Sequence, residues 1–417
     1  MTGRRIVVVS PRTWGQFGNY LAATRLAGVI ADQLPGDDVV VWEAESTLPW
    51  VGEIGGRMAQ ISQSSPDPVT RSARYLDLIA EVEREHPAGF EVDDESPVRA
   101  KMAGLREAFE QERPDLVVST KGFTARLCKA AMRDSGLDVP VAAYVTNPGL
   151  LELALHRSPH LDAVLVPFDW TKDHLLRATE VRPESVHVVG PLVAQRDLGA
   201  FVEASNDPAD QTSWPDDPSA ADRPRIILFS NRGGDDYHRM LRHLADRHPY
   251  VDVTFVGYHD ESLVNRAAGG EDVPARWRFH TRLTQQQYFG YMEGAAAAQD
   301  ALLLSKAGPN TTLEAAYFGI PVLMLRSGLP MESWVDGLIE ENRLGRCCGD
   351  VDELLPVLDD WLADRTAIRA HREACRRFAD TALNQKTAAE RIGRVVRGLL
   401  DPETAIATAG RPRRGDQ

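Results

Sequence analysis

The chain has 417 residues, of which 43% are hydrophobic and 26% charged, and its formal net charge at pH 7 is −14. This length is enough for two or three domains with sizeable cores, and the composition is that of a globular protein. The negative charge argues against nucleic acid as the main partner and against electrostatic docking to an anionic membrane.

The amino-terminal residues are basic and then apolar, but the apolar run at residues 6–9 is too short for a signal peptide. No stretch approaches the roughly 20 apolar residues of a membrane span. The four cysteines lack the spacing of metal ligands, and reduced thiols are the simpler interpretation. We therefore expect a cytoplasmic protein without a transmembrane segment.

Residues 6–9 form the first predicted strand, and a glycine-punctuated loop at residues 10–20 separates it from a predicted helix at 21–33. Consecutive β-branched residues are typical of a parallel strand that is buried on both faces. A strand, a glycine-rich loop and a helix in this order indicate a Rossmann-like domain. The glycines do not have the spacing of a dinucleotide site, so no such cofactor is implied.

The segment 43–95 follows the second predicted strand, 39–42, and is of mixed character apart from one predicted helix at 68–84. Long excursions at this place in an α/β sheet are often functional lids or acceptor surfaces. A peripheral helical insertion explains the same pattern equally well, and both interpretations stay open.

The first half then contains further predicted strands, at residues 115–120, 139–146, 162–167 and 186–192. Lys121 directly follows the first of them, at the edge where open parallel sheets bind ligands. A solvated lysine is the commoner case at such a position.

Residues 204–224 are rich in Asp, Pro, Ala and Ser, which predicts a surface linker or a disordered insertion. A second domain is predicted to begin with the strand at 225–230, which Arg232 and Gly233 follow. This loop is interpreted either as a phosphate-binding loop in which Arg232 supplies charge, or as a flexible turn with a solvated arginine.

Residues 301–325 are the stretch of the chain that most strongly indicates a ligand site. They are predicted to form a strand, a short loop, a helix that opens at Thr311 and Thr312, and a second strand. Gly308 would lie at the carboxyl end of a strand and the amino end of a helix, where backbone N–H groups and the helix dipole favour an anion such as phosphate. The alternative is an ordinary capping box formed by Thr311 and Glu314.

The run Ser-Lys-Ala-Gly-Pro-Asn-Thr-Thr-Leu-Glu-Ala-Ala-Tyr-Phe-Gly-Ile-Pro, followed by Gly-Leu-Pro-Met-Glu, resembles the donor-site signature of GT-B nucleotide-sugar glycosyltransferases. It is most similar to that of the bacterial enzyme that adds N-acetylglucosamine to the lipid-linked peptidoglycan precursor, and to that of the monogalactosyldiacylglycerol synthases. The resemblance is specific at residue level only between about residues 230 and 332.

The resemblance implies a role for each matching position in the second half. The loop would hold the donor diphosphate, Glu314 the ribose hydroxyls, Met331 and Glu332 the sugar, and Leu283 the uracil. The implied donor-binding set is Arg232, Gly233, Leu283, Ser305, Lys306, Ala307, Gly308, Pro309, Asn310, Thr311, Thr312, Glu314, Met331 and Glu332. No metal is implied, because the donor region has no Asp-x-Asp motif.

Three positions depart from the pattern of the family. Met331 replaces an amide that would contact the sugar, and Asn147 follows Thr146 where the family has an aspartate. Asn19, after Gly18, stands where a histidine would accept the acceptor's proton, and an amide is not a base at neutral pH. Gly18, Asn19, Thr146 and Asn147 are the implied acceptor-side residues, and the candidates for another base are Glu43, Glu45, Glu152 and His156.

We predict the α/β class, with two Rossmann-like domains whose parallel sheets face a central cleft, as in the GT-B fold. The first domain, 1–195, would bind the acceptor and the second, 225–385, the nucleotide-sugar. The remaining expected segments are a linker at 196–224, a terminal helix at 386–402 that crosses back to the first domain, and a tail at 403–417.

The implied reaction is transfer of a sugar from a UDP-sugar to an acceptor with inversion, with no tightly bound cofactor. A soluble small-molecule acceptor fits the acidic composition better than a lipid. Two other functions stay open: a UDP-sugar 2-epimerase of the same architecture, and a non-catalytic protein that binds sugar nucleotides. The sequence does not indicate an oligomeric state.

Overall fold

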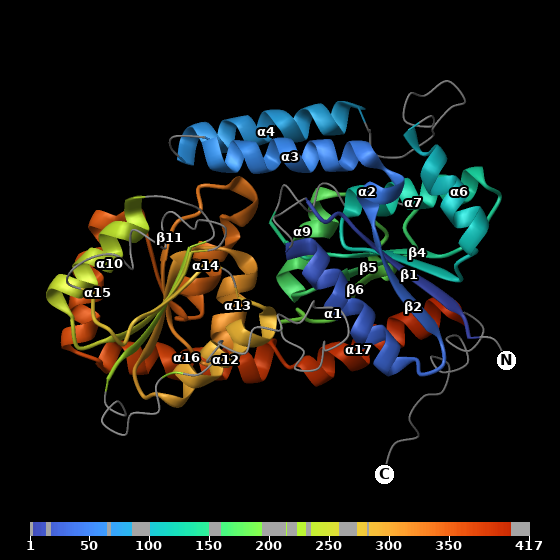
Figure 1. Cartoon of the computed structure of the whole chain (residues 1–417). Coiled ribbons are helices and arrows are strands. Elements are labelled where there is room, and N and C mark those ends of the chain that lie inside the picture. The colour runs from blue at the N-terminus through green and yellow to red at the C-terminus, as the bar shows by residue number, and fades with distance from the viewer. Residues whose placement is uncertain are drawn as a thin grey trace, which may run out of the picture. The chain divides into compact units, whose positions relative to one another are not determined.

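The computed structural model describes residues 3–13, 18–64, 68–85, 101–149, 160–193, 214, 223–230, 235–257, 273–281 and 283–401. The chain divides into two compact units (Figure 1). Unit 1 contains Met1–Ala194 and Asn384–Gln417, and unit 2 contains Gln195–Leu383. Each unit is built on a six-stranded parallel sheet. The predicted fold class of two Rossmann-like domains with parallel sheets is confirmed.

The sheet of unit 1 has the strand order β2-β1-β3-β4-β5-β6. The chain therefore changes direction across the sheet between β1 and β3, and this is the point where open α/β sheets bind ligands. The strands are β1 (Arg5–Ser10), β2 (Asp38–Glu43), β3 (Leu116–Ser119), β4 (Val141–Tyr144), β5 (Ala163–Val166) and β6 (Val186–Val188).

Two helices from opposite ends of the chain complete the core on one face of this sheet. Ile6 and Val8 of β1 pack with Leu26 of α1 (Gly18–Gln33) and with Ile392 and Val396 of α17 (Gln385–Leu400). The other helical elements of unit 1 are α2 (Ala44–Thr47), α3 (Pro49–Ser64), α4 (Pro68–Glu85), α6 (Ala103–Glu112), α7 (Gly122–Asp134), α9 (Asp169–Ala178) and η1 (Pro183–Ser185).

The excursion after β2 is more regular than we predict from its sequence. The helix expected at 68–84 is present as α4, but a second long helix, α3, precedes it and lies beside it (Figure 1). The sequence of α3 does not predict a helix because it contains three glycines, and glycine is a poor helix former. Gly55 has a packing reason, since a Cβ at this position would lie 2.3 Å from Thr13 Oγ1.

The sheet of unit 2 has the strand order β12-β11-β10-β7-β8-β9. Renumbered from its own first strand, this is the order of a dinucleotide-binding Rossmann sheet, with the reversal between β7 and β10. The strands are β7 (Arg225–Ser230), β8 (Asp252–Gly257), β9 (Arg278–His280), β10 (Ala301–Lys306), β11 (Val322–Leu325) and β12 (Gly345–Cys348). The Cys347–Cys348 pair, which the sequence allows in either a strand or a turn, lies in β12.

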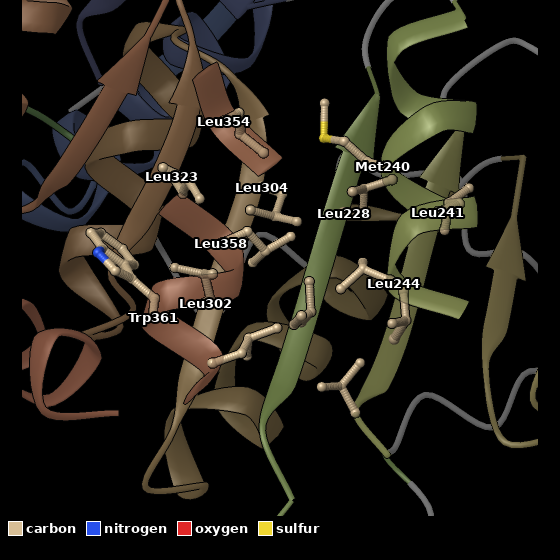
Figure 2. Packing of buried hydrophobic residues seen from close by; sticks show 14 of the residues in the cluster. Leu228, Met240, Leu241, Leu244, Leu302, Leu304, Leu323, Leu354, Leu358 and Trp361 are labelled. Atoms are coloured by element: carbon tan, nitrogen blue, oxygen red, sulfur yellow. The ribbon is translucent and has the colours of Figure 1, made fainter. Parts of the chain in front are cut away.

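Alternate residues of the strands in unit 2 face two separate cores, as the period of two in a strand requires. One face carries Leu228, Leu302, Leu304 and Leu323 and is covered by α10 (Asp235–Arg247) and α15 (Val351–Ala363) (Figure 2). The opposite face carries residues such as Ile227 and packs against α12 (Gln285–Ala297), α13 (Pro309–Tyr317) and α14 (Trp334–Glu341). Unit 2 also contains η3 (Pro330–Glu332) and α16 (Thr366–Ala382).

Trp214 departs from the expectation of a surface linker at 196–224. Its side chain is buried, its indole Nε1 donates a hydrogen bond to the carbonyl of Tyr291 at 2.9 Å, and its ring contacts that of Tyr291 edge-on. Gly294 leaves space for the indole, since a Cβ there would lie 2.3 Å from the ring. At least this residue of the segment belongs to the core of unit 2.

Among the described helices, none is both long and apolar enough to cross a bilayer.

Candidate functional site

The loop after β10 has the geometry of an anion site. Gly308 is the N-cap of α13, in extended backbone conformation, and Pro309 is the first helical residue. The helix therefore begins two residues earlier than we predict, and Thr311 is not its cap. Proline is favoured at this first position because its ring fixes φ and the missing N–H would have no intrahelical partner. The N–H groups of Asn310 and Thr311 lie in the first turn, where the helix itself offers no acceptor.

Gly308 is not explained by the surrounding fold. Its φ of −128° is open to any residue. Among the residues that the structure describes, a Cβ at Gly308 would meet only the carbonyl oxygen of Lys306, at 3.8 Å. Neither backbone strain nor a neighbouring atom among the described residues demands a glycine. Glycine suits an N-cap, and it also lets a ligand approach the main chain closely.

The loop lies at the topological switch point of unit 2. β10 and β7 are adjacent parallel strands, with Ser305 opposite Phe229 in the register. The Ser305 hydroxyl donates a hydrogen bond to the carbonyl oxygen of Phe229 at 2.7 Å, which ties the ends of the two strands together. Arg232 and Gly233, predicted to form the second phosphate loop, follow β7 and lie outside the described residues.

Lys306 and Glu332 are brought together from the end of β10 and from η3. The Lys306 ammonium lies 2.6 Å from Glu332 Oε2, and their side chains are only 9% and 16% exposed. The Ser327 hydroxyl also donates to Glu332 Oε2. The sequence places both charged residues beside the donor, but it does not predict that they form an ion pair with each other.

Two other predicted donor residues use their polar groups within the fold. The Thr312 hydroxyl donates to the Met324 sulfur at 3.8 Å and its N–H bonds to the carbonyl of Gly308, while the Ala307 N–H bonds to the carbonyl of Leu325. The N–H groups that the helix start can offer to an anion are therefore those of Gly308, Asn310 and Thr311. Glu314 and Met331 are buried, and Leu283 packs against the core beneath α12 and α13.

A second polar cluster lies at the switch point of unit 1. The Thr120 hydroxyl, after β3, donates to Ser10 Oγ at the end of β1 at 2.7 Å. The Thr146 hydroxyl, after β4, donates to the side-chain oxygen of Asn19 at 2.6 Å. The predicted acceptor-side residues Asn19 and Thr146 are thus in contact, and Gly18 begins α1 beside them.

The two amides that replace an expected histidine and an expected aspartate have roles in the local structure. Asn19 accepts the hydrogen bond from Thr146, and Asn147 accepts one from the Gly149 N–H at 3.3 Å, which closes a tight turn. Lys121, for which the sequence favours a solvated position, is instead 4% exposed and occupies the N-cap position of α7. Burial is a tertiary property, so the local sequence carries no signal for it.

The candidate bases fall into two groups. Glu45 accepts hydrogen bonds from the N–H groups of Arg12 and Thr13 and from the Thr13 hydroxyl, at 2.7–3.0 Å. Burial raises its pKa, but these hydrogen bonds outweigh burial and hold the pKa of Glu45 below its ordinary value. Glu43 forms an ion pair with Arg12 at 2.7 Å. Both carboxylates hold the loop after β1, and Glu152 and His156 lie outside the described residues.

Comparisons with family models and with curated proteins find no match. Solved structures do match. A UDP-N-acetylglucosamine 2-epimerase from Listeria monocytogenes, itself a provisional assignment, aligns with 14% identity and a TM-score of 0.58 over 100% of both chains. The UDP complex of MnaA from S. aureus aligns with 15% identity and a TM-score of 0.58 over 97% of this chain and 98% of that one.

The third structure is MurG of Acinetobacter baumannii, with 14% identity and a TM-score of 0.54 over 94% of this chain and 99% of that one. Identities this low establish the fold alone. The chain has the two-domain GT-B architecture, which both nucleotide-sugar glycosyltransferases and UDP-N-acetylglucosamine 2-epimerases share.

Proposed function

We propose that this GT-B protein is a glycosyltransferase that moves a sugar from a UDP-sugar to an acceptor. The observation that carries the proposal is the start of α13, where a glycine that the described fold does not require caps a helix at the switch point of a Rossmann sheet. This arrangement supports binding of a diphosphate, because main-chain N–H groups and the helix dipole converge on one small volume.

The chemical contribution of this site would be stabilisation of the leaving group. The acceptor oxygen attacks the anomeric carbon, the bond from that carbon to the diphosphate oxygen breaks, and UDP leaves with the electron pair. N–H donors held by a helix are already oriented toward the developing charge, so they need no reorganisation during the reaction. The Lys306–Glu332 pair gives a second source of charge, with Lys306 toward the diphosphate and Glu332 toward the sugar.

Recognition of the nucleoside is proposed to depend on Glu314 and Leu283. Glu314 lies on α13, one helical turn beyond Asn310, and a carboxylate can accept hydrogen bonds from both ribose hydroxyls. Leu283 precedes α12 and would pack against the base. Both assignments follow from the resemblance in sequence. They are supported by the place of Glu314 on α13 and by the packing of Leu283 against the core cluster that contains Ala307 and Ala315.

The acceptor is proposed to bind at the switch point of unit 1, near Asn19 and Thr146, and to be a small molecule. Neither Glu45 nor Glu43 is poised as a base, because the first accepts three hydrogen bonds from Arg12 and Thr13 and the second is paired with Arg12. Glu152 and His156 are therefore the proposed candidates for accepting the acceptor's proton, which predicts loss of turnover but retained UDP binding in Glu152→Gln or His156→Gln.

A UDP-sugar 2-epimerase is the second candidate. The likeness to epimerase structures over the full chain and the amide at Asn19, which cannot serve as the usual base, both favour it. Such an enzyme would use the same diphosphate site but would need no acceptor.

Thermal shift with UDP, UDP-N-acetylglucosamine, UDP-glucose and UDP-galactose tests the binding site. Ligand at about 100 times its Kd should stabilise the protein by roughly 2.7 kcal/mol. Glu314→Ala should abolish the shift, whereas Glu341→Ala, an exposed glutamate on the neighbouring helix α14, should retain it. A full shift in Glu314→Ala would remove the assignment of the site.

The reaction is tested by incubating the protein with the UDP-sugar that binds best, in D₂O, with and without candidate acceptors. Transfer predicts release of UDP only when an acceptor is present. Epimerisation at C2 predicts a second UDP-sugar and deuterium at C2 without any acceptor, because the C2–H bond must break. Binding with neither outcome would indicate a non-catalytic sugar-nucleotide-binding protein.

A further inference from the structure

A histidine–aspartate cluster in unit 2 joins α10, the residue that follows it and α15. The Nε2 atoms of His243 and His248 approach the same oxygen of Asp359, Oδ1, at 2.7 and 2.6 Å. The three ligand-type atoms lie within 4.8 Å of one another. No other group of three or more His, Cys, Asp or Glu side chains with this geometry occurs in the described part of the chain.

We propose that His243, His248 and Asp359 form a binding site for a divalent transition metal ion, with Zn²⁺ as the best match. Two imidazole nitrogens and one carboxylate oxygen are ligands that suit Zn²⁺, and a fourth, open position would be taken by water. The ligands are 20%, 10% and 28% exposed, which leaves an ion a path from solvent.

The side chains must rearrange to receive the ion. The three ligand atoms lie within 4.8 Å of one another, whereas bond lengths near 2.1 Å in a tetrahedral zinc site place ligand atoms about 3.4 Å apart. The imidazole rings would set the separation of the two Nε2 atoms, and Asp359 Oδ1 would have to withdraw by about 0.7 Å. Rotation of the aspartate side chain supplies a movement of this size. The two imidazole rings, with centroids 6.0 Å apart, already direct their Nε2 atoms toward one point.

Neighbouring side chains favour the arrangement in which His248 Nε2 and Asp359 Oδ1 bind the metal ion. Tyr250 Oη lies 3.2 Å from His248 Nδ1, and a tyrosine hydroxyl can accept from Nδ1–H when Nε2 binds the metal. Arg247 Nη2 lies 3.8 Å from the other oxygen of Asp359, Oδ2, and leaves Oδ1 to the ion.

The position of the cluster separates it from the donor site. His243 lies near the carboxyl end of α10 and His248 precedes β8, so both lie at the amino edge of the parallel sheet. The loop at Gly308 lies at the carboxyl edge. An ion here would link α10 to α15, whose leucines already share one core (Figure 2). We therefore assign it a structural role that does not depend on the proposed reaction.

Calorimetric titration of the untagged, full-length chain with ZnCl₂ after treatment with a chelating resin tests the proposal. We expect one ion per chain with a micromolar or lower Kd, and a visible spectrum of four-coordinate Co²⁺ when cobalt replaces zinc. Asp359→Asn and His243→Gln should each weaken binding at least 100-fold, and Tyr250→Phe about 10-fold, as loss of an outer-shell partner does.

His238→Gln is the matched control, because His238 is on the same helix but bonds Arg242 instead of the cluster. It should bind zinc like the wild type, and Zn²⁺ should raise the Tm of both proteins but not that of Asp359→Asn. Circular dichroism in EDTA identifies a variant that fails to fold. If Asp359→Asn or His243→Gln does not fold, the zinc affinity of the other variant tests the site. Absence of Zn²⁺ and Co²⁺ binding by the wild type, or unchanged affinity in the folded ligand variants, would overturn the site.

Discussion

At the scale of single residues, substitution of Gly308 is the change in the donor loop that best distinguishes an effect on ligand binding from an effect on stability. Gly308→Ala should cost the apo protein only about 1 kcal/mol, the usual difference between glycine and alanine at an N-cap. The added methyl group would stand between the main chain and a phosphate, so UDP affinity should fall at least 10-fold, or about 1.4 kcal/mol. Titration calorimetry with UDP measures this loss.

Gly337→Ala is the control for that substitution. Among the described residues its Cβ would meet only Glu341 Oε1, at the same 3.8 Å that separates a Gly308 Cβ from its neighbour, but Gly337 lies inside α14. We expect this variant to bind UDP normally and to be more stable, because alanine is the better helix former. Equal UDP affinity in both variants would contradict close approach at Gly308.

The Lys306–Glu332 pair gives a second prediction at this scale. Because both side chains are largely buried, Lys306→Met should leave an uncompensated carboxylate and cost about 3–5 kcal/mol in the unfolding of unit 2. Adding Glu332→Gln should recover part of that loss. A double-mutant cycle from urea unfolding measures the coupling, and additive single effects would show that the two residues do not interact.

At the scale of elements, α3 and the loop after β1 are predicted to be coupled through Gly55. Gly55→Ala would force a Cβ against Thr13, which Glu45 holds in place, so it should destabilise unit 1. Gly56 is the adjacent helical residue, and among the described residues nothing lies within 4 Å of a Cβ there. Gly56→Ala should therefore stabilise by about 0.5–1 kcal/mol, as expected for a helix interior.

Thermal or urea unfolding of the two variants compares them directly. The opposite signs are the expected result, since the residues are neighbours in sequence and differ only in the space beside them. A stabilising effect of both alanines would mean that α3 does not approach Thr13.

Elements with regular patterns are readable from the sequence, and tertiary contacts are not. The helices expected at 68–84 and 386–402 are present as α4 and α17, each within two residues of the expected bounds, because an amphipathic helix carries its signal locally. The strand β12 is short and contains the Cys347–Cys348 pair between glycines, so it has no such signal. The glycines of α3 mask a helix in the same way.

In the candidate site, too, the local features are predictable from the sequence and the tertiary contacts are not. The motif around Gly308 predicts a loop, a helix start and a diphosphate position, because these are local features. The pairing of Lys306 with Glu332, the burial of Lys121 and the meeting of His243 with Asp359, 116 residues away, depend on how distant segments pack. Chain order alone cannot supply that information.

At the scale of the whole molecule, one unit is formed by a single segment of the chain and the other by two separate segments. Unit 2 is one continuous segment, and both of its core clusters use residues from 214 to 368 only. Unit 1 is discontinuous, because Ala388, Ile392 and Val396 of α17 complete its core. The carboxyl-terminal helix is thus a component of the amino-terminal unit.

Truncation of the chain tests this dependence. A protein ending at residue 383 should lose on the order of 5 kcal/mol in unit 1, since burial of an Ile or Val side chain contributes about 1.5–3 kcal/mol and three residues are removed from the core. A protein ending at residue 401 keeps α17 and should melt like the full-length chain. Equal melting of the two truncated proteins would show that α17 adds nothing to unit 1.

The segment 195–383 alone gives the complementary prediction. Because its sheet is covered on both faces by its own helices, we expect it to fold cooperatively in isolation. The proposed UDP contacts, at Gly308, Asn310, Thr311 and Glu314, all belong to this segment, so its Kd for UDP should lie within a few-fold of that of the intact chain. Calorimetry on both proteins measures the two constants. A folded segment that does not bind UDP would place essential nucleotide contacts in unit 1 and would exclude a donor site built from unit 2 alone.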